Sequence, residues 1–101
     1  MKHPLINPDS AHYDSWGGEP AIARFERNYT VGELMAWARL NFAKYTDPAR
    51  AAKGQIHSDK KKAATCLAYY NFLLDIVRKA PHLREVSAKK AYTILGIYLE
   101  Y

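Results

Sequence analysis

The chain has 101 residues, enough for one small domain with a modest core. Hydrophobic residues make up 49% and charged residues 25%, as in ordinary folded proteins, and a single cysteine, Cys66, excludes a disulfide within the chain. The net charge is +5, and residues 41–101, with eleven Lys/Arg against five Asp/Glu, carry +6, which favours an anionic partner. No stretch is apolar for long enough to form a signal peptide or a membrane span, so we expect a cytoplasmic protein.

Residues 1–18 are predicted to form a loop, because prolines and glycines alternate there with Asn, Asp and Ser. So long a loop in a small domain is typically functional, and this one carries the pair His12 and Tyr13. Glu19 and Pro20 then open a first helix that ends near Asn28, since proline is tolerated in a first helical turn.

A second helix is predicted from Thr30 to about Thr46. Thr30 and Glu33 form a capping-box pattern, and Pro48 ends the helix. Asn41 falls on its apolar stripe, where a buried amide either binds a structural partner or lines a pocket. The other residues of the stripe recur at helical spacing: Leu34, Trp37, Ala38, Phe42 and Tyr45.

Two more helices are predicted after a loop at 47–57. Ser58 or Asp59 caps a third helix, which runs to Lys79, and Ser87 caps a fourth helix over residues 88–99. The apolar stripe of the third helix is the clearest in the chain: Ala63, Cys66, Leu67, Tyr70, Leu73, Leu74 and Val77.

These elements predict a single all-α domain over residues 1–101, a small bundle of about four helices. Within it, residues 1–18 form the N-terminal loop, 19–80 the helical core and 81–101 a C-terminal helix. Cys66 lies in an apolar stretch and is expected to be buried packing.

Polar side chains on neighbouring helices indicate a phosphate-bearing ligand. Spacings of three and four residues place them on one face of each helix: Asn41, Lys44 and Tyr45 on the second helix, Asp59 and Lys62 on the third. The loop between the two helices adds Arg50. Amide, ammonium, guanidinium and phenol groups beside a carboxylate suit the recognition of phosphate.

Several other chemistries lack their motifs. The five glycines form neither a phosphate-binding loop nor a dinucleotide fingerprint, and one Cys with four scattered His does not supply a zinc site. No Glu-x-x-Glu pair is present, whereas helical nucleotide pyrophosphohydrolases use such pairs to hold magnesium. This absence weighs against that activity, and none of these motifs predicts a protein metal site.

The remaining pattern resembles a known family. His12-Tyr13, Gly18-Glu19, Asn41-x-x-Lys44-Tyr45 and Asp59-x-x-Lys62-Ala63 are similar, in order and spacing, to the motifs of the SaV-like small phage proteins, a family to which nucleotide kinase activity is ascribed. The resemblance covers about residues 7–75. The chain departs from the family where residues 46–49 precede Arg50 and where Cys66 replaces an aromatic residue, and residues 80–101 lie outside the resemblance.

The resemblance implies a phage-encoded nucleotide-binding protein of the host cytoplasm, or a nucleoside monophosphate kinase that has no P-loop. Lys44 and Lys62 would contact phosphate, and Asp59 would hold magnesium, the candidate cofactor, or orient Lys62. Other residues would bind the base, the sugar or the phosphate: His12, Tyr13, Asn41, Tyr45 and Arg50. Because so small a bundle is shallow, we expect a homo-oligomer to complete the site.

Structural roles compete with each assignment. The lysines suit solvated positions, Asp59 suits a helix N-cap, Tyr45 suits the core, and His12 and Tyr13 suit a pinned loop. Two other functions also stay open. One is a small basic nucleic-acid-binding module, whose affinity would fall steeply with salt. The other is an interaction protein that inhibits a host factor through its many tyrosines.

Overall fold

A computed structural model describes residues 1–6, 19–52, 54 and 56–101. Over these residues the fold is all-α, which confirms the predicted class. A short 3₁₀ helix at Pro81–Glu85 joins the last two α-helices. The α-helices are α1 (Ala21–Asn28), α2 (Val31–Tyr45), α3 (Pro48–Ala51), α4 (Ile56–Lys79) and α5 (Ala88–Leu95).

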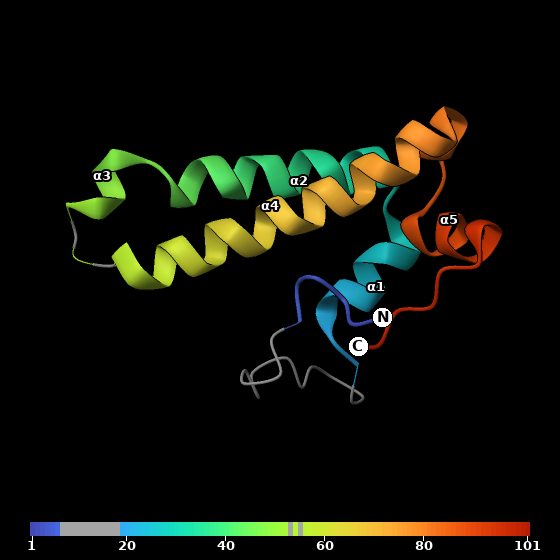
Figure 1. Ribbon diagram of the computed structural model, residues 1–101, viewed down its shortest axis with the longest axis horizontal. Coiled ribbons are helices and arrows are strands. Elements are labelled where there is room, and N and C mark those ends of the chain that lie inside the picture. Colours follow the sequence, from blue (N-terminus) through green and yellow to red (C-terminus); the bar gives the residue numbers. More distant parts are fainter. Residues whose placement is uncertain (7–18, 53, 55) are drawn as a thin grey trace.

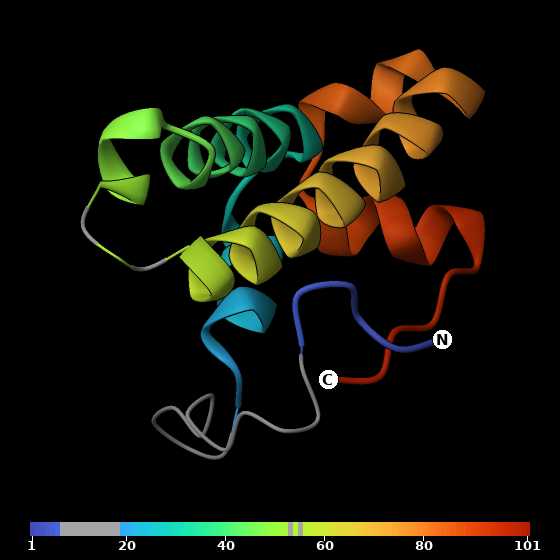
Figure 2. The same cartoon turned by 60° about the vertical axis from the view of Figure 1, so that its left-hand side comes forward.

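Two long helices dominate the molecule. α2 and α4 lie side by side and run in opposite directions, and the short α3 lies at the turn between them (Figures 1 and 2). α1 and α5 pack at the other end of this pair, where both chain ends also lie. The helices thus gather at one end of the α2/α4 pair, rather than forming an even four-helix bundle. None of the helices in the described ranges is long and apolar enough to cross a membrane.

The N-terminal ends of α2 and α5 are both capped and lie next to each other. The predicted capping box is present: the Thr30 hydroxyl accepts from the Glu33 amide at 3.1 Å, and the Glu33 carboxylate accepts from the Thr30 amide at 2.9 Å. Ser87 caps α5 as predicted, by accepting from the Lys90 amide at 3.2 Å. A β-bridge joins Thr30 to Ser87, so the starts of α2 and α5 are held side by side.

The third predicted helix starts earlier than expected. α4 begins at Ile56, so the expectation that Ser58 or Asp59 caps it is wrong. Its buried face is also rotated relative to the predicted stripe: Tyr69 and Ile76 are buried, whereas Leu67 is 42% exposed. The physical reason is that this face packs chiefly against α2, where Tyr69 contacts Trp37, while the Tyr69 hydroxyl donates a hydrogen bond to Glu26 of α1.

The C-terminal helix is shorter than predicted. α5 ends at Leu95, because Gly96 takes a left-handed conformation with φ +69°, which glycine adopts without strain. The predicted helix over 88–99 is therefore wrong from residue 96 onward. The chain beyond Gly96 instead pairs with its own start: the His3 amide donates to the Glu100 carbonyl at 3.1 Å, and the Glu100 amide donates to the Met1 carbonyl at 2.8 Å.

Candidate functional site

Three cations surround one tyrosine at the α3 end of the molecule. The Lys44 ammonium, the Arg50 guanidinium and the Lys62 ammonium lie 5.2, 5.1 and 5.4 Å from the centroid of the Tyr45 ring. They come from α2, α3 and α4, so the fold brings together residues that the sequence separates. Cations at this distance from an aromatic ring are attracted by its electron-rich face. We call these four residues the Tyr45 cluster.

The short helix α3 is what carries Arg50 into this cluster. Pro48 cannot continue α2, and it instead occupies the first turn of α3. The Asp47 carboxylate caps that helix by accepting from the Ala49 amide at 2.9 Å. The chain therefore folds back within a few residues and presents Arg50 to α4, whereas sequence analysis placed it in a loop.

Arg50 forms a two-point ion pair with Asp59. Its Nε donates to Oδ2 of Asp59 at 2.8 Å, and its Nη2 donates to Oδ1 at 3.1 Å. Only 6% of the Asp59 side chain is exposed. These hydrogen bonds hold the pKa of the Asp59 carboxyl below its usual value, and the carboxylate in turn raises the pKa of Arg50. The bidentate geometry fixes the orientation of the guanidinium.

The other two cations have no such partner among the residues that the structure describes. No described carboxylate lies within 4.0 Å of Lys44 or Lys62, and Asp59 and Asp47 supply the nearby negative charge. Lys60 and Lys61 are exposed on the same turn of α4 as Lys62. This end of the molecule thus carries an excess of positive charge, which attracts anions.

A groove of about 500 Å³ begins beside the Tyr45 cluster, a volume in the range of small-molecule sites. Its basic end holds Tyr45, Lys61 and Lys62. The opposite end is apolar and is formed by the N-terminal segment, α1 and α2: Leu5, Ile6, Ala21, Ile22, Phe25 and Trp37. The groove therefore matches a ligand that has an anionic group at one end and an apolar or aromatic body at the other.

Asn41 and Cys66 line the middle of this groove. The Asn41 amide nitrogen donates to the Trp37 carbonyl one turn earlier, at 2.9 Å, which leaves its oxygen without a partner in the described part of the chain. Cys66 is buried, as expected, and this burial raises the pKa of its thiol. Asn41 thus offers the groove a hydrogen-bond acceptor, and Cys66 an apolar surface.

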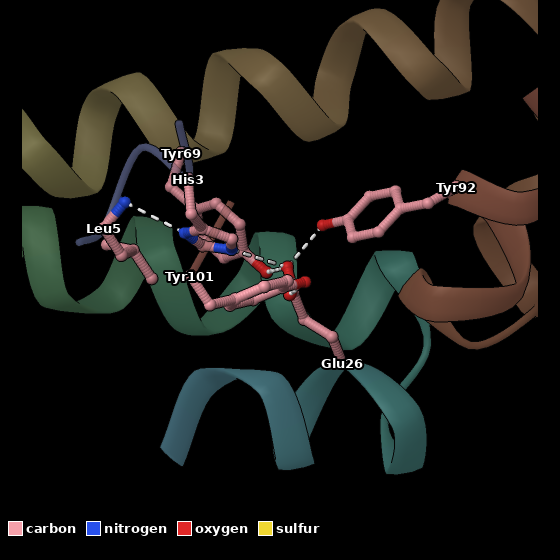
Figure 3. A network of polar contacts seen from close by, with 6 residues as sticks. All are labelled: His3, Leu5, Glu26, Tyr69, Tyr92 and Tyr101. Carbon is pink, nitrogen blue, oxygen red and sulfur yellow. Dashed lines mark hydrogen bonds and ion pairs between the residues drawn. The ribbon is translucent and has the colours of Figure 1, made fainter. Parts of the chain in front are cut away.

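A second polar cluster, which the sequence did not predict, lies in the core. The fully buried Glu26 of α1 accepts hydrogen bonds from four side chains (Figure 3). His3 donates from Nε2 at 2.9 Å and Tyr69 from its hydroxyl at 2.6 Å, and the hydroxyls of Tyr92 and Tyr101 also donate. We call these five residues the Glu26 network. The one sequence signal for it was that Glu26 shares the buried face of α1 with Ile22.

The Glu26 carboxyl stays charged in this setting. Burial by itself would raise its pKa, but the hydrogen bonds donated by His3, Tyr101 and Tyr69 outweigh burial and hold the pKa below its usual value. The pKa values of the three tyrosines are raised, chiefly by burial and by the neighbouring carboxylate, so their hydroxyls keep the protons that they donate.

The structure thus brings four of the predicted site residues together in the Tyr45 cluster, namely Lys44, Tyr45, Arg50 and Lys62, with Asp59 paired to Arg50. Tyr45 and Lys62 also line the groove, as does Asn41 farther along it. His12 and Tyr13 lie outside the described residues. Comparison with protein-family models, with curated proteins and with solved structures found no match to this chain.

Proposed function

We propose that the protein binds a small phosphate-bearing ligand with an aromatic body, and that this ligand is a nucleotide. The observation that carries the proposal is the arrangement of Lys44, Arg50 and Lys62 around Tyr45, at the basic end of a mainly apolar groove. Cations placed on phosphate and an apolar wall placed on a base are the complementary halves of such a site.

Each half of the ligand has its own contacts in this proposal. Lys44 and Lys62 contact the phosphate, and Asp59 acts as a positioning residue that holds the Arg50 guanidinium beside them. The base lies against Phe25 and Trp37, where stacking on aromatic side chains is favourable for every base. The Asn41 oxygen accepts a hydrogen bond from an amino or imino group of the base.

Nucleotide kinase activity is the finer proposal, and its support is the resemblance to the SaV-like small phage proteins. Phosphoryl transfer needs phosphate-binding cations, a metal ion and a positioned acceptor. Both oxygens of Asp59 already accept from Arg50, which suits a positioning residue better than a magnesium ligand. Incubation with ATP, nucleoside monophosphates and magnesium tests the activity: formation of diphosphate supports it, and its absence in a protein that binds nucleotide leaves binding as the function.

A thermal-shift screen tests the binding proposal. A ligand that binds only the folded state raises the melting temperature by mass action. We expect nucleoside monophosphates to raise it at millimolar concentration, and Lys62→Ala or Lys44→Ala to remove the shift. Lys60→Ala is the matched control, because Lys60 lies on the same turn as Lys62 but neither lines the groove nor lies over the Tyr45 ring. Absence of a shift, or an undiminished shift in Lys62→Ala, would contradict the proposal.

A second candidate is binding of nucleic acid. The observation that favours it is the run of exposed lysines at residues 60–62, beside Lys44 and Arg50. Fluorescence anisotropy with single-stranded oligonucleotides separates the two candidates. Nucleic-acid binding predicts a steep fall of affinity with salt and a loss in Lys60→Ala as well as in Lys62→Ala.

The assembly and the location are also proposals. We propose a phage-encoded protein of the host cytoplasm that forms a homo-oligomer. The support for the oligomer is a row of partly exposed aromatic side chains along α1 and α2, formed by Phe25, Tyr29 and Trp37. Light scattering after size-exclusion chromatography measures the oligomeric state, and a monomer at all concentrations contradicts this part of the proposal.

A further inference from the structure

We infer that the Glu26 network is a clamp that holds one wall of the groove, so that docking of the chain ends and binding of the ligand are coupled. The wall consists of Leu5 and Ile6, which line the apolar end of the groove. The clamp itself depends only on the fold and needs no ligand. The coupling rests on the proposed function, because it needs a ligand that reaches this wall.

Hydrogen bonds hold the His3 ring at both of its nitrogens. The Leu5 amide donates to Nδ1 of the ring at 3.1 Å, so Nδ1 carries no proton and Nε2 holds the proton that Glu26 accepts. The Ile6 amide donates to the His3 carbonyl at 3.1 Å. His3 therefore fixes the turn that places both wall residues, and Glu26 fixes His3.

Tyrosines from three different parts of the chain converge on Glu26. Tyr69 comes from α4, Tyr92 from α5 and Tyr101 from the C-terminal segment, and their hydroxyls point toward the carboxylate from different sides (Figure 3). The His3 ring lies between two of these rings, with centroids 5.1 Å from Tyr69 and 5.0 Å from Tyr101. Removing one of these donors therefore weakens the packing and hydrogen bonding that hold the His3 ring in place.

The two ends of the groove belong to different parts of the fold. The Tyr45 cluster lies on α2, α3 and α4, whereas the wall is a strap of residues 1–6 that the clamp holds. The affinity of a ligand that spans the groove therefore depends on the clamp, whereas the affinity of a ligand confined to the basic end does not. Docking and binding are then linked thermodynamically. If undocking of the wall weakens ligand binding by a given factor, the bound ligand stabilises the docked wall by the same factor.

The experiment compares Tyr101→Phe with Tyr98→Phe, its matched control, because Tyr98 is 85% exposed and donates no side-chain hydrogen bond to a described residue. Hydrogen exchange of the Leu5 and Ile6 amides reports docking. Loss of one hydrogen bond to a charged group predicts exchange about tenfold faster or more in Tyr101→Phe and unchanged exchange in Tyr98→Phe. Equal exchange in the two variants would overturn the clamp.

Binding of two probes tests the coupling in the same variants. Adenosine monophosphate spans the groove, and inorganic phosphate reaches only its basic end. We expect Tyr101→Phe to weaken the binding of the nucleotide several-fold and to leave that of inorganic phosphate unchanged, a split that general destabilisation does not produce. Equal affinities for the nucleotide in Tyr101→Phe and in the unmodified chain overturn the coupling. If the unmodified chain binds neither probe, the proposed function and the coupling both fail, and the exchange rates alone decide the clamp.

Discussion

The Glu26 network and the Tyr45 cluster are built from similar groups but differ in balance. In the first, a fully buried carboxylate accepts from one imidazole and three phenols, and none of the buried side-chain nitrogen or oxygen atoms that the structure describes lacks a partner. In the second, cations outnumber the carboxylates around an accessible tyrosine ring.

This difference separates structure from function in a small chain. A buried polar group must be satisfied within the protein, because an unpaired one destabilises the fold. A surface cluster can remain unbalanced at little cost, because water screens its charges. The satisfied network therefore holds the fold together, and the unbalanced cluster is where we propose that a ligand binds.

Removal of the central carboxylate should have the largest effect. Glu26→Ala leaves four donors without their acceptor, three of them buried, and is expected to lower the free energy of unfolding by about 3–5 kcal/mol. Urea denaturation measures the loss. A loss below about 1 kcal/mol, the size of an ordinary surface change, would mean that the network does not hold the fold together.

Removal of a single donor should cost less. Tyr69→Phe deletes one hydrogen bond to a charged group and is expected to lower the free energy of unfolding by about 1.5–3 kcal/mol. Its neighbour provides the control, because Tyr70 has no side-chain hydrogen bond to a described residue. Tyr70→Phe should stay within about 0.5 kcal/mol of the unmodified protein, and equal losses for the two variants would contradict the assignment.

Acid should weaken the network in a defined pH range. Because the folded-state pKa of Glu26 is depressed, the stability it contributes is fully present above its unfolded pKa of about 4.3. That stability is lost as pH falls through the lower folded-state pKa. Glu26→Gln should therefore flatten the dependence of stability on pH below about 4, as followed by urea denaturation at a series of pH values. An unchanged slope would show that Glu26 is not a stabilising charged group.

The rate at which the Cys66 thiol is modified should depend on whether the groove is occupied. Because burial raises the pKa of its thiol, iodoacetamide should modify it at least about tenfold more slowly in the folded protein than in urea. A nucleoside monophosphate that fills the groove should slow the reaction further, as measured by mass spectrometry. Modification at the same rate with and without the nucleotide would place the ligand elsewhere.

The smallest effect is expected at the Tyr45 cluster. Lys62→Ala removes one of several like charges at the surface, so the free energy of unfolding should change by less than about 0.5 kcal/mol, with any gain largest at low salt. Urea denaturation at two salt concentrations checks this result. A loss of 2 kcal/mol or more, roughly the size of a buried hydrogen bond to a charge, would make Lys62 a structural residue.

Local signals in the sequence predicted much of the fold. The caps at Thr30 and Ser87 and the stop at Pro48 act within a few residues, so they are readable from the chain. The end of the last helix at Gly96 was not predicted, because a lone glycine near the end of a helical pattern is either tolerated within the helix or ends it.

The two polar clusters differed in how far they could be predicted. Lys44, Tyr45 and Lys62 were identified because helical spacing puts polar groups on one face. The pairing of Arg50 with Asp59 was not, since it depends on the turn made by α3. The Glu26 network was missed altogether, because its donors lie up to 75 residues away in the sequence and only tertiary packing brings them together.

The most direct test of the central claim follows the tyrosine rings by NMR during a titration with adenosine monophosphate. Tyr45 stands for the unbalanced cluster, and Tyr92, which is 2% exposed and bound to Glu26, stands for the satisfied network. We predict that the Tyr45 ring signals shift saturably with the nucleotide, that those of Tyr92 hardly move, and that Lys62→Ala abolishes the response. A Tyr45 ring that does not respond, or a Tyr92 ring that responds as strongly, would contradict the account.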